Sequence, residues 1–246
     1  MIWHETGGAG DAPTHVFVHG LGATAEVWRP VAERVGATAP WVLVDLPGHG
    51  RSASAPPYTY DAFAAAVAAV LAPGPEVVVA GHSLGGVVGL ALAGGSYGIR
   101  VTRTVALGVK VAWTDEELDR AATLATRPPR TFPSRAEAAA WSLRLAGLDG
   151  LVAPDGPAVA PGVLETADGW QAAWDPRSAA VGRPPMATLI AAAEGTVVLA
   201  CGEHDHMVSG AQLADLAPHP VVLPGLGHNA HVEDPDRVAG LVLGRG

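Results

Sequence analysis

The chain contains one cysteine, Cys201, and one lysine, Lys110, among its 246 residues. A single cysteine excludes an intrachain disulfide and suits a reducing compartment. The sequence has no cluster of Lys and Arg, and its formal net charge is −9. Nucleic acid and anionic membrane surfaces are therefore not expected partners, because both select basic patches.

Long apolar runs are also missing, since none reaches the roughly 20 residues that a membrane-spanning helix needs. The first segment, MIWHETGGAGDAPTH, has no basic stretch followed by an apolar one, so no signal peptide is expected. Charged residues make up only 16% of the chain and apolar residues 49%, which is a globular composition. We expect a cytoplasmic protein, monomeric or homodimeric.

Six short runs are apolar at consecutive positions, which is typical of strands buried on both faces of a parallel sheet. Helical patterns lie between these runs. The alternation predicts an α/β fold with a mostly parallel central sheet flanked by helices. The predicted strands are 14–19, 41–45, 76–81, 103–109, 196–202 and 220–225, and the predicted helices are 24–35, 59–72, 84–95, 187–194, 209–217 and 231–243.

The alternation breaks over 113–187, where no convincing strand is found and helix starts appear instead. Thr114 with Glu117, and Ser134 with Glu137, each have the spacing of a capping box. We therefore predict a helical lid inserted into one core domain. The predicted core domain is 1–112 and 188–246, and the lid is 113–187.

The segment VVVAGHSLGGVVGLAL places Ser83 between a predicted strand and a predicted helix. Its pentapeptide, Gly-His-Ser-Leu-Gly, has the glycines that a sharp strand-to-helix turn needs around a nucleophilic serine. A serine that only caps the helix is the alternative, but it does not explain glycine at 81, 85 and 86. The pattern favours a nucleophile.

A serine hydroxyl needs a base, and the base needs an orienting carboxylate. Asp205 and His228 each follow a predicted strand, so they fall at the same sheet edge as Ser83. Their order along the chain is Ser, Asp, His. Asp115 is a rival for the acid, although a first-turn helix position gives it an ordinary explanation.

Several motifs occur in an order that resembles the α/β-hydrolase superfamily, in its lid-bearing branch of esterases, lactonases, carbon–carbon hydrolases and perhydrolases. The resemblance implies that Ser83 is the nucleophile, His228 the base and Asp205 its partner. It also implies an oxyanion hole made by the backbone N–H groups of Leu21 and Leu84. The motifs are HGLG (19–22), DLPGHGRS (45–52), GHSLGG (81–86), GEHDHMV (202–208) and GLGHNAHVEDP (225–235).

The family's leading β-hairpin is expected to be trimmed here, because only residues 1–7 precede the turn GGAGDAP. A metal site is conceivable where His204, Asp205 and His206 adjoin in sequence. The triad already accounts for Asp205, so neither a metal nor any other cofactor is expected.

The expected substrate is a small-to-medium, neutral, partly apolar carboxylic ester or lactone, cleaved through an acyl-enzyme. Carbon–carbon hydrolysis or perhydrolysis by the same triad is the alternative, and a non-catalytic small-ligand receptor is a third. Tryptophans of the lid are candidates for the pocket wall, with Trp170 and Trp174 spaced for one helical face. The expected pocket residues are Gly20, His82, Trp113, Trp141, Leu145, Trp170 and Val208.

Overall fold

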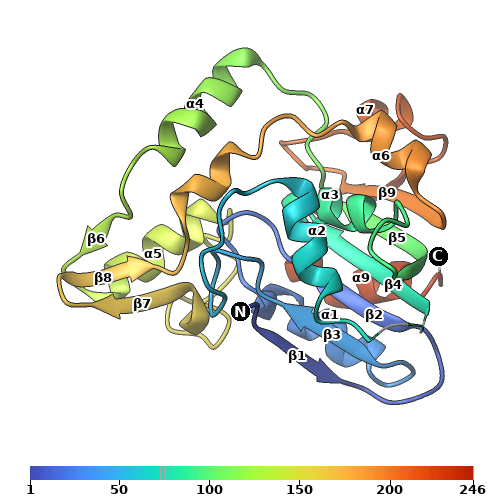
Figure 1. Cartoon of the computed structure of the whole chain (residues 1–246), viewed down its shortest axis with the longest axis horizontal. Coiled ribbons are helices and arrows are strands. Elements are labelled where there is room, and N and C mark those ends of the chain that lie inside the picture. Colours follow the sequence, from blue (N-terminus) through green and yellow to red (C-terminus); the bar gives the residue numbers. More distant parts are fainter. Residues whose placement is uncertain (73, 75, 246) are drawn as a thin grey trace.

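The computed structural model describes residues 1–72, 74 and 76–245, and its centre is a seven-stranded sheet of order β1-β3-β2-β4-β5-β9-β10 (Figure 1). All neighbours are parallel except β1, which pairs antiparallel with β3. The strands are β1 (His4–Gly7), β2 (Thr14–Val18), β3 (Trp41–Val44), β4 (Glu76–His82), β5 (Arg100–Leu107), β9 (Thr196–Gly202) and β10 (Val221–Leu223).

The six predicted strands are confirmed, and the α/β fold class with them. Consecutive residues of β2 alternate between the two faces: Phe17 packs into one core cluster, whereas Val16 and Val18 pack into the other. Both faces are covered, which is why the strands are apolar throughout. One strand, β1, precedes β2 among the described residues.

Helices cover each face of the sheet. On one face α1 and α9 contact each other, and on the other α2 packs against α3. The predicted helix over 231–243 is in fact two helices, because Asp234 begins a new one and Pro235 occupies its first position. The helices of the core are α1 (Arg29–Val35), α2 (Tyr60–Ala68), α3 (Leu84–Leu92), α7 (Gly210–Ala214), α8 (Ala230–Glu233) and α9 (Pro235–Val242).

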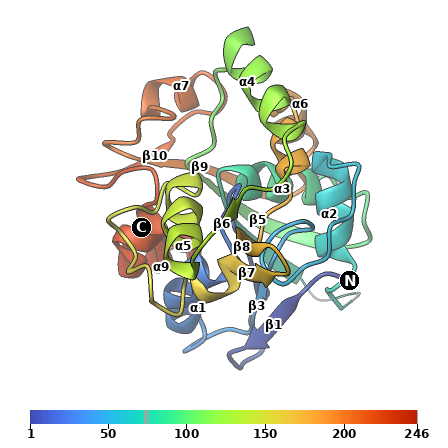
Figure 2. The ribbon, with the colours of Figure 1, turned by 90° about the vertical axis from the view of Figure 1, so that its left-hand side faces the viewer.

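The segment 113–187 is not purely helical, so that expectation was wrong. It contains a three-stranded antiparallel sheet of order β6-β8-β7, which faces the viewer beside α5 in Figure 2. Its strands have only two to four residues each, too few for a pattern of period two to stand out. The elements are α4 (Asp115–Ala125), β6 (Thr131–Phe132), α5 (Arg135–Leu145), β7 (Val163–Thr166) and β8 (Gly169–Ala172). Helix α6 (Met186–Ala192) begins at the end of the segment and packs against α3 of the core.

Two finer predictions for this segment have mixed outcomes. Thr114 and Glu117 form the full capping box at the start of α4. Ser134 caps α5 by accepting the Glu137 N–H, without the return bond. Trp170 and Trp174 do not share a helix, since Trp170 belongs to β8 and Trp174 follows it.

Among the described residues, no helix has both the length and the apolarity needed to cross a membrane.

Candidate active site

Ser83 occupies the sharp turn between β4 and α3, with φ 49° and ψ −115°. This conformation is costly for a residue with a side chain and is held only by close surroundings. A Cβ at Gly81 would lie 2.1 Å from the Gly85 carbonyl oxygen, and a Cβ at Gly85 would lie 2.2 Å from the Val18 carbonyl oxygen. Glycine at both positions therefore lets the strand, turn and helix approach closely enough to hold the serine.

His228 and Asp205 lie together at the carboxyl edge of the sheet. The His228 Nδ1 atom is 3.0 Å and 3.1 Å from the two carboxylate oxygens of Asp205. The Asp205 side chain is 0% exposed and also accepts the Met207 N–H, while the His228 side chain is 11% exposed. Because Nδ1 donates to the carboxylate, the neutral ring presents Nε2 as its basic atom. Asp115 lies apart, 96% exposed and paired with Arg183.

The two expected oxyanion donors come from different elements. The Leu84 N–H belongs to the first turn of α3, whose N–H groups have no partner within the helix. Leu21 follows a peptide whose carbonyl, on Gly20, accepts hydrogen bonds from His19 Nδ1 at 2.8 Å and from the Ala23 N–H at 3.2 Å. Since N–H and C=O of one peptide point in opposite directions, these bonds turn the Leu21 N–H away from its own loop.

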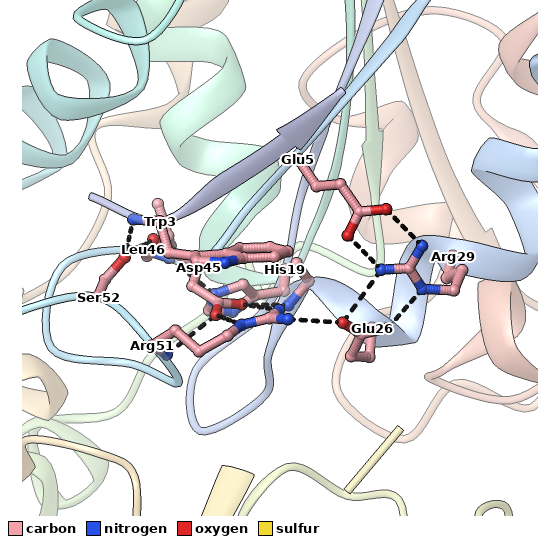
Figure 3. Close-up of polar contacts among 10 residues, drawn as sticks. Trp3, Glu5, His19, Glu26, Arg29, Asp45, Leu46, Arg51 and Ser52 are labelled. Atoms are coloured by element: carbon pink, nitrogen blue, oxygen red, sulfur yellow. Dashed lines mark hydrogen bonds and ion pairs between the residues drawn. The ribbon is translucent and has the colours of Figure 1, made fainter. Parts of the chain in front are cut away.

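A network of ion pairs around the buried Asp45 supports the loop after β2, which contains Leu21 (Figure 3). Asp45 is fully buried and accepts the Ala25 N–H at 2.7 Å and the Arg51 Nε at 2.7 Å. Burial raises the pKa of Asp45, but the bonds from Arg51 and two backbone N–H groups outweigh it and leave the pKa below its usual value. Arg51 also binds Glu26 and lies over the Trp3 ring. The network fixes the loop after β2 to the loop after β3.

His82 connects three loops of the site. Its Nε2 lies 3.0 Å from the His228 carbonyl oxygen, and a Cβ at Gly20 would lie 2.9 Å from its Nδ1. Its ring packs 4.5 Å from the ring of His231 and 4.6 Å from that of His228, measured between centroids. Burial holds the pKa of His82 well below its usual value. A neutral His82 therefore spans the serine turn, the histidine loop and the oxyanion loop.

Ser83 and His228 open onto one cavity of about 310 Å³ beneath the segment 113–187. Such a volume suits a small or medium-sized ligand. Of the residues expected from the sequence, the cavity is lined by Gly20, Leu21, His82, Ser83, Leu84, Trp113, Leu145 and His228.

Three expected lining residues lie elsewhere. Trp141 packs against Phe132 and Trp174 within the lid. Trp170 pairs across the small sheet with Phe132. Val208 is buried in the core near α7. Each is held by packing inside its own region, so none reaches the cavity.

Several lining residues escaped the sequence analysis. They include Lys110, Arg144, Tyr60 and His206. A single lysine in an acidic chain was the one signal that could have pointed to Lys110. Arg144 had none, because only the fold of the lid over the sheet edge brings it there. Over the described residues, no group of three or more His, Cys, Asp or Glu side chains is placed to hold a metal ion.

The similarity of this chain to known proteins agrees with the geometry of the candidate site. The model of the alpha/beta hydrolase family matches residues 16–241, so the chain belongs to that family. Two solved structures share the fold over 98% of this chain, each with a TM-score of 0.79. They are the thioesterase domain from a curacin biosynthetic pathway, 20% identical and covered over 94% of its chain, and E-2-(acetamidomethylene)succinate hydrolase, 22% identical and covered over 93%.

Among curated proteins, the chain resembles a pimeloyl-[acyl-carrier protein] methyl ester esterase of Edwardsiella ictaluri, 44% identical over 89 residues. That match covers 36% of this chain and 33% of the relative. It also resembles an esterase of Mycobacterium tuberculosis, 44% identical over 89 residues, which are 34% of this chain and 29% of the esterase. The matched stretch thus spans about a third of the length of these relatives.

Proposed function

We propose that this protein is a serine hydrolase that cleaves a small-to-medium carboxylic ester or lactone through an acyl-enzyme. The observation that carries the proposal is that Ser83, in its strained turn, lines the same cavity as His228, whose ring is held by Asp205. The esterase names of the relatives support the choice of ester chemistry. The mainly apolar cavity wall supports a partly apolar substrate.

In the proposed reaction, His228 Nε2 accepts the Ser83 proton as Oγ attacks the ester carbonyl. The backbone N–H groups of Leu21 and Leu84 bind the oxyanion, and each such donor lowers the barrier by about 3 kcal/mol. His228 returns the proton to the leaving alcohol. It then activates the water that hydrolyses the acyl-enzyme, with Asp205 keeping the ring oriented.

The test is hydrolysis of p-nitrophenyl esters of increasing acyl length by wild type and by Ser83→Ala. We expect wild type to cleave them and the variant to lose about four or more orders of magnitude in kcat, because the nucleophile is gone. Ser96→Ala removes an exposed hydroxyl beyond the far end of α3 and is the matched control. The acyl length that is cleaved fastest measures the cavity.

Wild type that cleaves none of these esters would contradict ester chemistry. Carbon–carbon substrates and perhydrolysis would then be assayed with the same pair of proteins, and so would tight ligand binding without turnover. Cleavage that survives in Ser83→Ala would instead remove Ser83 from the proposal.

A further inference from the structure

The charges around the cavity differ from those of the whole chain. The chain has 24 Asp and Glu against 15 Lys and Arg. Among the described residues that line the cavity, however, there is no Asp or Glu, whereas Lys110 and Arg144 are both present. The chain as a whole is acidic. The Lys and Arg side chains among the described residues of this cavity are therefore not matched by any Asp or Glu in its lining.

The two cations are held differently. Lys110 forms an ion pair with Glu117, whose other oxygen accepts the Thr114 N–H at 2.9 Å. Its charge is thus largely matched within the protein. Arg144 makes no ion pair or side-chain hydrogen bond with any other described residue, and its side chain is exposed. Of the two cationic residues that line the cavity, Arg144 is therefore the one whose guanidinium has no partner among the described residues.

Arg144 has one possible partner within the fold, which is the carboxyl end of its own helix. It stands in the last turn of α5, where a cation is favoured by the helix dipole. That role is satisfied by any position in the last turn and does not require contact with the cavity. A guanidinium also matches a carboxylate with two parallel hydrogen bonds, which an ammonium cannot do.

We propose that the substrate carries a carboxylate remote from the scissile ester, and that Arg144 binds it. The substrate class is then the half-ester of a short dicarboxylic acid, with its apolar chain in the cavity and its free acid at Arg144. This inference rests on the proposed ester hydrolysis at Ser83. It differs from the neutral substrate expected from the sequence, and the experiment below decides between the two.

The experiment compares monomethyl with dimethyl esters of dicarboxylic acids of increasing chain length. For wild type we expect kcat/KM to be about tenfold higher for the monoester at the best length, chiefly through KM. In Arg144→Gln this preference falls to near one. Arg144→Lys restores part of it, because the charge returns without the fork of donors.

Arg135→Gln is the matched control, since Arg135 belongs to the first turn of the same helix and does not line the cavity. It removes the same charge and should keep the preference. Equal loss of monoester and diester cleavage in Arg144→Gln would assign Arg144 a purely structural role and overturn the inference.

The two proposals fail in distinguishable ways. Wild type that cleaves the diester as well as the monoester would refute the anionic substrate and leave the ester hydrolase standing. Wild type that cleaves neither ester, nor any p-nitrophenyl ester, would remove both.

Discussion

Helices α3 and α4 are of similar length but are held in opposite ways. Every residue of α3 is buried, from Leu84 to Leu92. No residue of α4 is buried, although one side of it rests on the short helix at Pro176–Ala180. The helix that follows Ser83 is thus fixed by the core, whereas α4 is fixed by its N-terminal cap and by ion pairs.

This difference sets a rigid edge of the sheet against one helix of the lid, α4, whose local stability is low. Few buried apolar contacts leave a segment free to open without unfolding the whole chain. In the proposed enzyme, substrate entry needs a segment that can open, whereas the proposed oxyanion hole and triad need fixed positions.

The difference between α3 and α4 is tested most directly by replacing one leucine of each helix with alanine. Leu90→Ala in α3 removes a fully buried side chain and should lower the free energy of unfolding by about 2–5 kcal/mol. Leu118→Ala in α4 removes a half-buried one and should cost less than about 1 kcal/mol. Urea unfolding followed by circular dichroism measures both. Equal losses would show that α4 is part of the core.

Mild acid, between about pH 6.5 and 5, should act on the core rather than on 113–187, because that segment contains no histidine. Burial lowers the pKa of His49 and of His231 to about 3 in each case. In the unfolded chain these two histidines are protonated below about pH 6.5, whereas in the folded chain they are protonated only near pH 3. The stability they contribute is therefore full above pH 6.5 and is lost as the pH falls toward 3.

Within that window, each of these histidines should lower the free energy of unfolding by about 1.4 kcal/mol for each unit by which the pH falls. Urea unfolding at pH 7, 6 and 5 measures the slope. His231→Leu supplies the control, since neither ring nitrogen of His231 has a hydrogen-bond partner among the described residues. It should make the slope shallower, and an unchanged slope would show that His231 does not contribute.

The smallest expected effect is on the cap of α4. Thr114→Ala removes the capping box and should destabilise α4 locally by about 1 kcal/mol, with little change in global unfolding. Hydrogen exchange should become faster over 115–125. Ser209→Ala removes the same kind of box from α7 and should leave that exchange unchanged. Unchanged exchange in Thr114→Ala would mean that Lys110 and Arg183 alone hold the helix.

The sequence predicted the rigid edge far better than the lid, and for a physical reason. Strands such as β4 are buried on both faces, so their consecutive apolar residues are visible without any partner. The turn around Ser83 could also be predicted, because the backbone of Gly85, four residues further on, requires glycine at position 81. His228 and Asp205 followed from their positions after strands.

The lid could not be predicted in the same way, since its small sheet depends on pairs distant in sequence. Phe132 of β6 lies opposite Trp170 of β8, and neither strand shows a period of its own. Of the lid tryptophans expected at the cavity, Trp113 lines it, whereas Trp141 and Trp174 pack against each other. Arg144 reaches the cavity only through that packing.

The strand order also sets the sequence of assembly during synthesis. The ribosome completes β2, β4 and β5, and with them the Ser83 turn, once residue 107 has been made. The remaining strands β9 and β10 join the edge only after the whole lid has emerged. His228 arrives last of the three groups. The nascent chain therefore holds Ser83 without His228 until residue 228 has been made, and only then can the proposed triad form.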